Sequence, residues 1–340
     1  MEGRNRIKRP QFIPRESLLT PVFASLTGQC VVAGYLVFST FYIINRLLSY
    51  WIEEDSWNQD YGLVSKAFEG FYYCLVVWVL YHVILLAVIY PVVAKFGQDK
   101  ALMIALVPLV FFVFMTFTGF VCFCVIETGP ASRIALSLET IRLCLKTWSF
   151  VFVMHDLLTS KEYHEEHGQS TTPMNEEENK TSVTIHDKEE EVTSLSHFVY
   201  FLFAPTGLYA PSYPRTENIN WIKFFLFHWI NFTIVFISIR FIQECFYPLN
   251  EVGVTTITRS VVNRQMFLFS VFSVFHLVFF NFIGIQHNWL NSFAEVMRFA
   301  DRHFYSDFWT FEIPKDFHRK WHLFGQEYLY YTVYSPGMFE

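Results

Sequence analysis

Three ionisable side chains recur at helical spacing within an otherwise apolar stretch of the sequence. Glu139, Arg142 and Lys146 are separated by three and four residues, so on a helix they share one face. Among the surrounding Leu, Ile and Phe residues, Glu139 and Arg142 could form a buried ion pair that holds neighbouring helices in register. Charges at such a depth indicate a helix that turns this face toward protein or toward a wet cavity.

Histidines and cysteines supply the other candidates for acid–base or metal chemistry. His82, His228 and His276 stand singly in apolar segments, where an imidazole is more often a hydrogen-bonded packing residue than a catalyst. The run 164–167, His-Glu-Glu-His, resembles metal-ligand spacing but fits no zincin pattern. Most of the six cysteines lie inside apolar runs without zinc spacing, so we expect no metal site and no disulfide framework.

Residues 304–309 place a carboxylate among aromatic rings, in the order F-Y-S-D-F-W. By itself this cluster is typical of an anchor at the membrane surface, because Trp and Tyr favour the headgroup zone. The sequence contains no glycine-rich phosphate loop and no serine nucleophile elbow. These residues alone predict a polytopic membrane protein with a cytosolic amphipathic region.

The elements that must position these residues are membrane-spanning helices. Of the 340 residues, 53% are hydrophobic and only 16% are charged, against about 25% charged in a typical soluble domain. Four runs contain no charged side chain: residues 22–45, 71–94, 101–126 and 266–286. Each covers the ~30 Å hydrocarbon core as a helix, since about 20 residues suffice and the backbone must bond to itself there.

Two further segments favour spanning helices although both carry charges. Residues 134–157 contain the charged face formed by Glu139, Arg142 and Lys146. Residues 221–245 contain Lys, Arg and Glu side chains. The alternative for each segment is a helix that lies on the membrane surface. We expect an all-α polytopic protein with about six spanning helices around an interior cavity.

The distribution of charge divides the chain into four regions and orients it. Residues 1–21 form a basic arm, whereas the loop after the first span is acidic, which places the N-terminus in the cytosol. Residues 22–157 hold the first four spans. Residues 158–196 are rich in Glu, Ser and Thr and predict a disordered cytosolic linker. Residues 197–340 hold two spans and amphipathic helices, and no basic patch in the chain indicates a nucleic-acid partner.

Several motifs, in order along the chain, resemble the sterol O-acyltransferases of the membrane-bound O-acyltransferase (MBOAT) superfamily. The motifs are P-A-S-R at 130–133, F-L-F-A-P-T at 201–206, S-Y-P-R-T at 212–216, W-L-N-S-F-A-E at 289–295, F-Y-S-D-F-W at 304–309 and Y-L-Y-Y at 328–331. The resemblance covers roughly residues 128–334. Diacylglycerol O-acyltransferases share the F-Y-x-D-W-W-N region, but the S-Y-P-R-T element is closer to the sterol branch.

This resemblance implies a multi-pass enzyme of the endoplasmic-reticulum membrane that transfers a long-chain acyl group from acyl-CoA to a sterol hydroxyl. It implies acyl-CoA as a substrate, no cofactor, contact with membrane lipid and a tendency to homo-oligomerise. The implied acyl-CoA region contains Tyr305, Asp307, Phe308, Trp309, Arg319, Trp321 and Tyr334. The implied structural motif residues are Ser212, Tyr213, Pro214, Arg215, Thr216, Glu295 and Arg298.

The sequence departs from the family pattern in three respects. The family's catalytic histidine, a general base on a later spanning helix, lies beyond Glu340, so the resemblance implies a C-terminally incomplete acyltransferase domain. The family's R-x-W-N element reads R-K-W-H, so His322 stands at the position of the active-site Asn, and Thr310 replaces the last Asn of F-Y-x-D-W-W-N. A substitute base at His322 would have to lie within hydrogen-bond reach of the substrate hydroxyl.

Three functions therefore remain open at the level of sequence. The first is sterol O-acyl transfer. The second is a non-catalytic membrane protein that binds lipid or acyl-CoA or partners an active acyltransferase, in which Arg215 and Arg319 would still suit the phosphates of CoA. The third is acyl transfer to diacylglycerol or another lipid alcohol. A channel or transporter is disfavoured, because the spans contain few charges and no paired broken helices.

Overall fold

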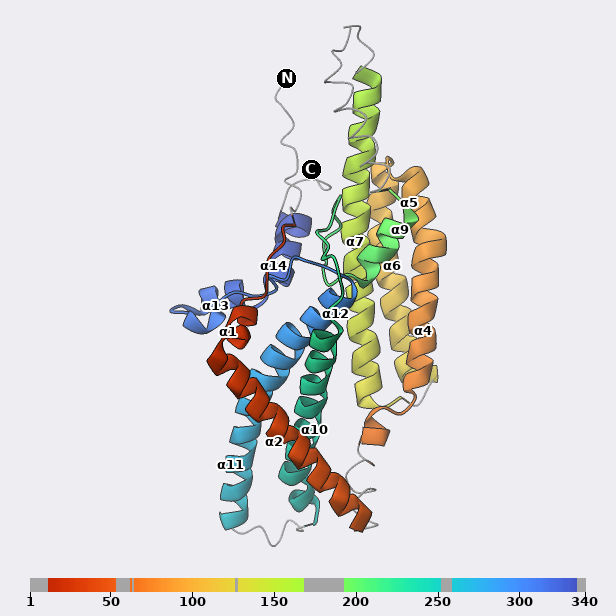
Figure 1. The fold of residues 1–340 in the computed structure, drawn as a ribbon. Helices are drawn as coiled ribbons and strands as arrows, with labels where there is room; N and C mark the ends of the chain where they lie inside the picture. Colours follow the sequence, from red (N-terminus) through yellow and green to blue (C-terminus); the bar gives the residue numbers. More distant parts are fainter. Residues whose placement is uncertain are drawn as a thin grey trace. The chain divides into compact units, whose positions relative to one another are not determined.

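The computed structural model describes residues 12–52, 62, 64–125, 128–167, 193–251 and 259–334. In this part of the chain the regular structure is helical, with two isolated β-bridges and no strand (Figure 1). The prediction of an all-α protein is therefore confirmed. Residues 1–11 of the predicted basic arm and residues 168–192 of the predicted linker lie outside the described residues.

Contacts between helices group the chain into two compact units. Unit 1 consists of Met1–Ile13, Ser65–Pro214 and Phe324–Glu340, and unit 2 consists of Pro14–Val64 and Arg215–Leu323. Each unit therefore combines segments that are far apart in the sequence.

Unit 1 is built mainly from long helices of the first half of the chain. Its elements are α4 (Phe71–Ile84), η1 (Leu85–Ile89), α5 (Tyr90–Phe96), α6 (Lys100–Phe120), η2 (Val121–Val125), α7 (Pro130–His167), α9 (Leu195–Phe203), α14 (Leu323–Leu329) and η6 (Tyr330–Tyr334). Asp99 begins α6, because its carboxylate accepts the backbone N–H groups of Ala101 and Leu102 at 3.0 and 3.2 Å. The long helix α7 packs against α4, α5 and α6.

Hydroxyl groups join three of these helices inside the unit. Tyr81 on α4 is buried and donates its hydroxyl hydrogen to the carbonyl oxygen of Phe114 on α6, at 3.0 Å. The same hydroxyl lies 2.7 Å from Thr118 Oγ1, which in turn lies 2.9 Å from Thr140 Oγ1 on α7. Such hydrogen bonds supply the attraction between helices that apolar side chains do not provide in lipid.

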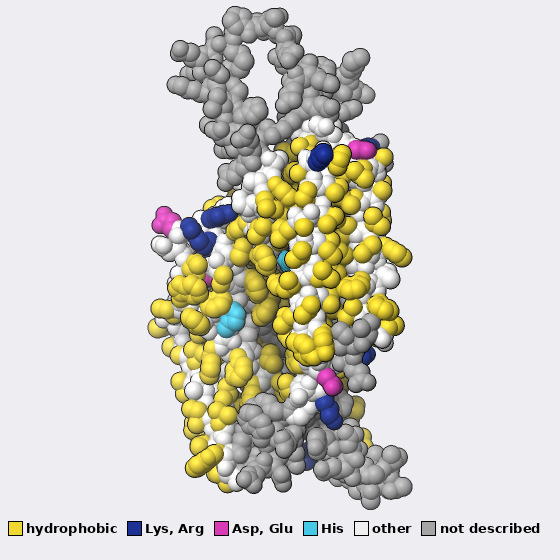
Figure 2. Space-filling model, turned by 90° about the vertical axis from the view of Figure 1, so that its right-hand side faces the viewer, with side chains coloured by type: hydrophobic (Ala, Val, Ile, Leu, Met, Phe, Trp, Pro, Cys, Tyr) yellow, Lys and Arg dark blue, Asp and Glu magenta, His cyan; other side chains and the backbone are white. Residues whose placement is uncertain are grey.

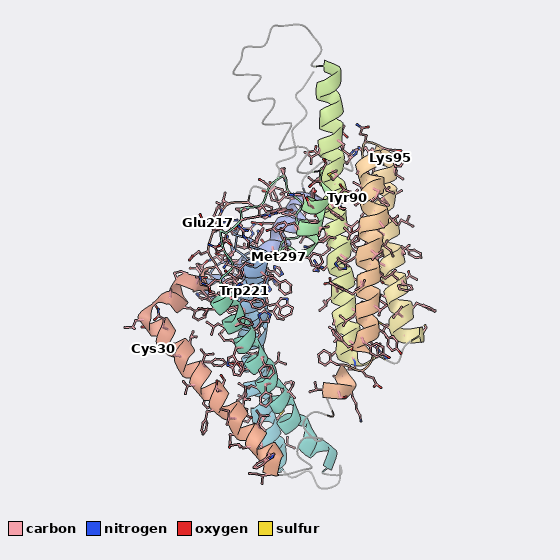
Figure 3. All side chains as sticks on the ribbon, turned by 45° about the vertical axis from the view of Figure 1, so that its right-hand side comes forward. Cys30, Tyr90, Lys95, Glu217, Trp221 and Met297 are labelled. Carbon is pink, nitrogen blue, oxygen red and sulfur yellow. The ribbon has the colours of Figure 1, made fainter. Side chains whose placement is uncertain are left out.

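Unit 2 packs α10 against a long run of helix made of three consecutive elements. The elements of the unit are α1 (Leu19–Ala24), α2 (Leu26–Ile52), α10 (Trp221–Glu251), α11 (Arg259–Phe275), η4 (His276–Trp289), α12 (Leu290–Val296), η5 (Phe308–Thr310) and α13 (Pro314–Trp321). The π-helical segment η4 connects α11 to α12, and α10 contacts all three. Figure 3 shows Trp221, the first residue of α10, near Met297 at the end of α12.

Four helical segments are long and apolar enough to cross a membrane: Leu26–Asn45, Val64–Phe96, Lys100–Cys124 and Trp221–Ile239. They coincide with four of the six predicted spans. Most of their side chains lie outside the packed interior, and Figure 2 shows hydrophobic side chains over much of the visible face. An apolar surface of this extent indicates a lipid environment. The predicted spans 134–157 and 266–286 lie in α7 and in α11–η4, and their crossing of the membrane stays a prediction.

Candidate functional site

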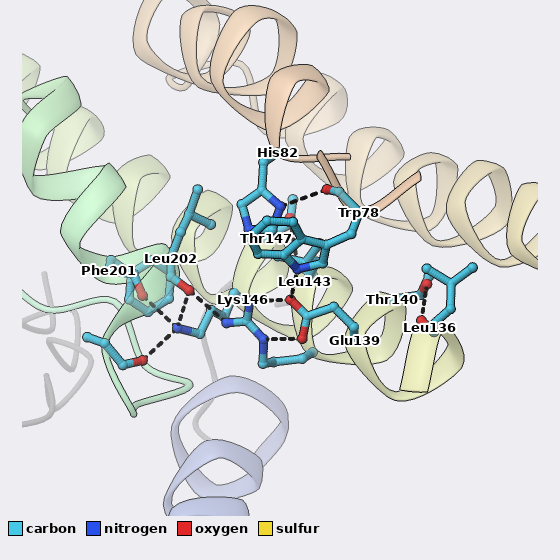
Figure 4. Close-up of polar contacts among 12 residues, drawn as sticks. Trp78, His82, Leu136, Glu139, Thr140, Leu143, Lys146, Thr147, Phe201 and Leu202 are labelled. Carbon is cyan, nitrogen blue, oxygen red and sulfur yellow. Dashed lines mark hydrogen bonds and ion pairs between the residues drawn. The ribbon is translucent and has the colours of Figure 1, made fainter. Parts of the chain in front are cut away.

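The F-L-F-A-P-T motif forms the C-terminal end of α9 and the turn after it, and a buried lysine binds this end. Lys146 Nζ on α7 donates to three carbonyl oxygens, those of Phe201 (2.6 Å), Leu202 (2.9 Å) and Ala204 (2.7 Å) (Figure 4). An ammonium group has three N–H donors, and here all three are used. The last carbonyls of a helix lack partners within it and carry the negative end of its dipole, so a cation stabilises them.

Glu139 and Arg142 extend this polar contact toward α4. Arg142 Nη1 donates to the carbonyl oxygen of Leu202 at 2.7 Å, and Arg142 Nε donates to Glu139 at 2.8 Å. The Glu139 carboxylate also accepts the indole N–H of Trp78 on α4 at 2.7 Å. The ion pair expected from the spacing is therefore present, and it joins α7 to α4 and to α9.

His82 lies beside this group and makes a local hydrogen bond. Its Nδ1 lies 2.8 Å from the carbonyl oxygen of Trp78, so Nδ1 is the donor. The ring stacks on Phe203 with centroids 5.3 Å apart. Its Nε2 has no hydrogen-bond partner among the described residues. These contacts are those of a packing residue, as expected for a lone histidine on a spanning helix.

The first half of the S-Y-P-R-T motif holds the loop after α9 in unit 1. Tyr213 is buried, and its hydroxyl donates to the carbonyl oxygen of Leu208 and accepts the N–H of Ala210, both at 2.9 Å. His197 Nε2 donates to the carbonyl oxygen of Ala210 at 2.8 Å, and its ring stacks on Tyr213. Burial raises the pKa of Tyr213 well above its ordinary value, so the phenol stays neutral. Ser212 is exposed and Pro214 is half-buried.

The second half of the same motif pairs with the chain after α12 in unit 2. Thr216 and Arg298 form a reciprocal pair: Thr216 N donates to Arg298 O at 2.8 Å, and Arg298 Nε donates to Thr216 O at 2.7 Å. Arg215 forms an isolated antiparallel bridge with Phe299. Arg298 itself has φ of 55°, because it follows the end of α12 in a left-handed turn. The phenylalanine after it donates its N–H to Ala294 O at 2.8 Å, which closes that turn.

We expect glycine to be better tolerated than alanine at position 298. A side chain in the left-handed region costs about 1 kcal/mol, and Arg298→Gly removes this cost while Arg298→Ala keeps it. Both variants lose the side-chain bond from Arg298 Nε to Thr216 O and keep the backbone bond from Thr216 N. The free energy of unfolding of Arg298→Gly should therefore exceed that of Arg298→Ala by about 1 kcal/mol. The measurement is a denaturant titration in detergent. The same two changes at exposed Arg264 in α11 should rank in the opposite order, because glycine weakens a helix interior. An identical order at both positions would contradict the argument.

Glu295 connects the end of α12 to the start of α10. Its Oε1 accepts the backbone N–H of Asn220 at 2.7 Å, and its Oε2 pairs with Arg302 Nη1 at 2.6 Å. Asn220 in turn caps α10, because its side-chain oxygen accepts the N–H of Lys223 at 3.0 Å. Glu295 is 3% exposed. The implied structural role of this residue therefore corresponds to a buried polar contact between two helices.

The two motifs that the resemblance assigns to acyl-CoA lie against each other in unit 2. Asp307 pairs with Lys320 Nζ at 3.1 Å and accepts the hydroxyl hydrogens of Thr310 at 2.8 Å and Ser306 at 3.0 Å. The bonds from Thr310, Lys320 and Ser306 lower the pKa of Asp307 to about 2. The backbone N–H of Ser306 donates to Lys320 O at 2.9 Å. Thr310, which stands where the family's F-Y-x-D-W-W-N pattern has its last Asn, therefore bonds directly to the carboxylate of Asp307.

Aromatic rings complete this contact between the two motifs. Phe308 is buried and meets Trp321 edge to face, with centroids 5.2 Å apart, and Trp321 stacks on Phe317 at 5.5 Å. Trp309 is 47% exposed, and Arg319 on α13 is exposed. Unit 2 contains Tyr305, Asp307, Phe308, Trp309, Arg319, Trp321 and His322, and within it Phe308 contacts Trp321 directly.

The two remaining predictions for this region concern His322 and Tyr334. His322 ends α13, and burial lowers its pKa, which favours the neutral imidazole that a base requires. Tyr334 lies at the end of η6 in unit 1 and is 74% exposed. Among the described residues, no group of three His, Cys, Asp or Glu side chains is placed to hold a metal ion.

One buried polar cluster was not predicted from the sequence. Tyr305 Oη lies 2.7 Å from His287 Nδ1 and accepts the hydroxyl hydrogen of Ser17 at 2.9 Å. Asn291 Nδ2 donates to His287 O at 2.7 Å. All four side chains are at most 1% exposed. The spacing of His287 and Asn291, one helical turn apart directly after an apolar run, could have indicated that the two side chains lie close together. It could not have identified Ser17 as their partner.

The N-terminal segment reaches this cluster by pairing with the chain after α12. Arg15 and Asp301 form a two-bond ion pair, with Nε–Oδ1 and Nη2–Oδ2 both at 2.8 Å. The backbone N–H of Arg15 donates to Ala300 O at 3.0 Å, and Arg302 N donates to Arg15 O at 2.8 Å. These bonds place Ser17 beside Tyr305.

Comparison with known proteins relates the whole chain to one group of enzymes. Sterol O-acyltransferase 1 of Rattus norvegicus is 28% identical over a match that covers 95% of this chain and 57% of that protein. The chain is a relative of the sterol O-acyltransferases. Sterol O-acyltransferase 1 of Mus musculus is 27% identical and matches 95% of the chain. Sterol O-acyltransferase 2 of Mus musculus is 25% identical and matches 97%. No family model matches the chain.

The similarity to the sterol O-acyltransferases confirms the resemblance that the motifs indicated. It extends beyond those motifs, because the matched 95% includes the first spanning helices. The four apolar helices of spanning length indicate a membrane protein. The chain spans between 57% and 60% of the length of these three relatives.

Proposed function

We propose that this chain takes part in the transfer of a long-chain acyl group from acyl-CoA to the hydroxyl of a sterol. The observation that carries the proposal is the similarity to proteins named sterol O-acyltransferase over 95% of the chain. The proposal includes residence in the endoplasmic-reticulum membrane with a cytosolic N-terminus, in the MBOAT arrangement. A sterol is itself apolar, and a reaction within the membrane would keep water from competing with its hydroxyl for the thioester.

In this proposal the packed motifs of unit 2 bind acyl-CoA. Arg319 is exposed on α13, and the phosphates of CoA need charge-assisted donors of this kind. Arg215, also exposed, is the second candidate for such a contact. The contact between the rings of Phe308 and Trp321 attaches α13 to the loop that precedes it. Tyr305 and Asp307 would hold the loop that precedes this helix.

The test is an acylation assay with protein reconstituted in lipid nanodiscs. Labelled oleoyl-CoA is supplied with cholesterol or with diacylglycerol, and sterol ester and triacylglycerol are measured separately. We expect sterol ester above the level of empty nanodiscs when the protein assayed includes the family's general base, a histidine that the resemblance does not place among residues 1–340. Arg319→Gln should raise KM for acyl-CoA about tenfold with little change in kcat, because a phosphate contact stabilises the bound substrate and the transition state equally. Arg264→Gln, which changes an exposed arginine on α11, should leave both constants unchanged.

A second candidate function is binding of acyl-CoA without turnover. The observation that favours it is the pair of departures at Thr310 and His322, where the family pattern has Asn. Saturable binding of a non-hydrolysable acyl-CoA, together with no ester formation from oleoyl-CoA, would favour binding without turnover. His322→Asn should then restore part of the ester formation if that Asn assists catalysis. Triacylglycerol in place of sterol ester, or neither binding nor ester, would overturn the proposed function.

A further inference from the structure

The loop between η5 and α13 exposes three large apolar side chains within five residues. Trp309, Phe311 and Ile313 are 47%, 46% and 59% exposed. The neighbouring rings pack inward, because Phe317 on α13 meets Phe308 and Phe311 with centroids 5.6 and 5.4 Å away. One side of the loop is therefore attached to unit 2, and its other side presents an apolar surface. A cluster of this kind marks a place where lipid or another protein makes contact.

The start of α10 gives the level of the membrane boundary in unit 2. The apolar span Trp221–Ile239 begins at the first residue of this helix. Glu295 in α12 binds Asn220, the residue before the span. His287 on η4 instead packs on Phe227 inside the span, with ring centroids 5.7 Å apart. The chain from η4 to α12 therefore runs antiparallel to α10, and residues that precede His287 lie deeper in the span.

Two rings of the loop region reach this deeper level. Phe282 precedes His287 by more than one turn of η4. Phe308 and Trp309 pack against Phe282, with centroids 4.7 and 5.7 Å away. The exposed part of Trp309 is thus level with the apolar span and not with the water beyond Asn220. Tryptophan is enriched at this level of a membrane, because its ring suits the region between hydrocarbon and headgroups.

Charged side chains next to the loop fit the same environment. Lys315 and Arg319 are exposed and lie one helical turn apart on α13, which begins directly after Ile313. Such side chains reach lipid phosphates while their aliphatic stems cover apolar surface. Glu312 is also exposed, and a carboxylate is costly in hydrocarbon. The loop can therefore insert only as far as the boundary between headgroups and acyl chains.

We propose that Trp309, Phe311 and Ile313 form a membrane-inserted surface whose partner is the phospholipid of the leaflet at the Trp221 end of α10. This insertion does not depend on the proposed function, because it follows from exposure and contacts inside unit 2. One consequence does rest on the proposed function. If Arg319 binds the phosphates of acyl-CoA, the long acyl chain of the same molecule lies in the leaflet beside this loop, and acyl-CoA reaches α13 from the membrane.

The test is photo-crosslinking in phosphatidylcholine nanodiscs without acyl-CoA. The photoreactive amino acid p-benzoylphenylalanine replaces Phe311 or Ile313, and the irradiated protein is searched by mass spectrometry for covalent phospholipid adducts. We expect adducts at both positions. Phe225, which is 63% exposed within the span of α10, is the positive control. Glu217, which is exposed and precedes that span, should give no adduct.

Adducts at Phe225 together with none at Phe311 and Ile313 would overturn the proposal. Crosslinks to protein in place of lipid would do the same, because they would identify a second copy of the chain or another polypeptide as the occupant. Absence of sterol ester in the acylation assay would count against the proposed function alone, since crosslinking to lipid requires no turnover.

Fluorescence quenching tests the third side chain of the surface. Lipids brominated near the carbonyl end of their acyl chains should quench a larger fraction of the emission in wild-type protein than in Trp309→Phe. Lipids brominated near the chain terminus should distinguish the two proteins less, because the insertion is shallow. Equal quenching of the two proteins by both lipids would show that Trp309 does not enter the membrane and would contradict the proposal.

Discussion

Replacing Lys146 with methionine is expected to lower the free energy of unfolding by about 3–5 kcal/mol, because it removes three hydrogen bonds from a charged donor, each worth about 1.5–3 kcal/mol before the cost of burying that charge is subtracted. Lys146 is 2% exposed, and its ammonium group donates to three carbonyl oxygens at the end of α9. Methionine fills similar space but has no donor. The carbonyl of Leu202 retains the bond from Arg142, and that of Ala204 retains the backbone N–H of Thr206 at 2.8 Å. The carbonyl of Phe201 loses Lys146 as its donor, and the fourth residue after it is Pro205, which has no N–H.

The measurement is unfolding by SDS titration, read by tryptophan fluorescence, together with hydrogen exchange of the amides in residues 197–210. We expect faster exchange there, because the end of α9 and its turn lose their anchor. Lys66→Met, at an exposed lysine of the same unit, should change the free energy of unfolding by less than about 0.5 kcal/mol. A Lys146→Met protein within 1 kcal/mol of wild type would show that these carbonyls do not depend on the lysine.

The Arg15–Asp301 pair is expected to give the next largest effect, with Arg15→Ala costing about 2–4 kcal/mol. Asp301 is 5% exposed, and two parallel hydrogen bonds of 2.8 Å join it to the guanidinium. Removing Arg15 leaves a buried carboxylate without this partner, and it also weakens the attachment of the N-terminal segment. Arg15→Lys should recover only part of the loss, because an ammonium cannot make the bidentate contact.

A double-mutant cycle with Arg15→Ala and Asp301→Asn measures the pair itself. We expect a coupling energy of about 1–3 kcal/mol. The matched control is the cycle of Lys320→Ala with Asp307→Asn, because that pair is similarly short but 34% and 46% exposed. Solvent screens an exposed pair, so its coupling should be clearly smaller. Equal coupling in the two cycles would contradict the argument from burial.

Several features of the fold could be predicted from residue order alone. A run such as residues 101–126 has no charged side chain and is longer than the hydrocarbon core requires, so it must be a helix wherever lipid surrounds it. The common face of Glu139, Arg142 and Lys146 also follows from helix geometry. The motifs from 201–206 to 328–331 indicated the family, since their order along the chain is itself specific.

The partners of these residues could not be predicted in the same way. Spacing identifies a charged face on α7 but does not say that Lys146 binds backbone carbonyls 55 to 58 residues later. A backbone carbonyl is present at every residue, so only the end of a helix, once placed, makes three of them converge. Arg298 shows the same limit, because its positive φ depends on where α12 stops.

The sequence by itself therefore determined the class of the protein and its resemblance to the sterol O-acyltransferases, because apolar length and motif order are properties of residue order alone. The tertiary structure decided which side chains share a site. Ser17 contacts His287 and Tyr305, which lie 270 and 288 residues later in the sequence. In the sequence this serine is one polar residue beside an apolar run, and only the pairing of Arg15 with Asp301 brings it to these partners. Long-range pairing of this kind leaves no periodic trace in the sequence, since it depends on the packing of helices and not on the spacing within any one of them.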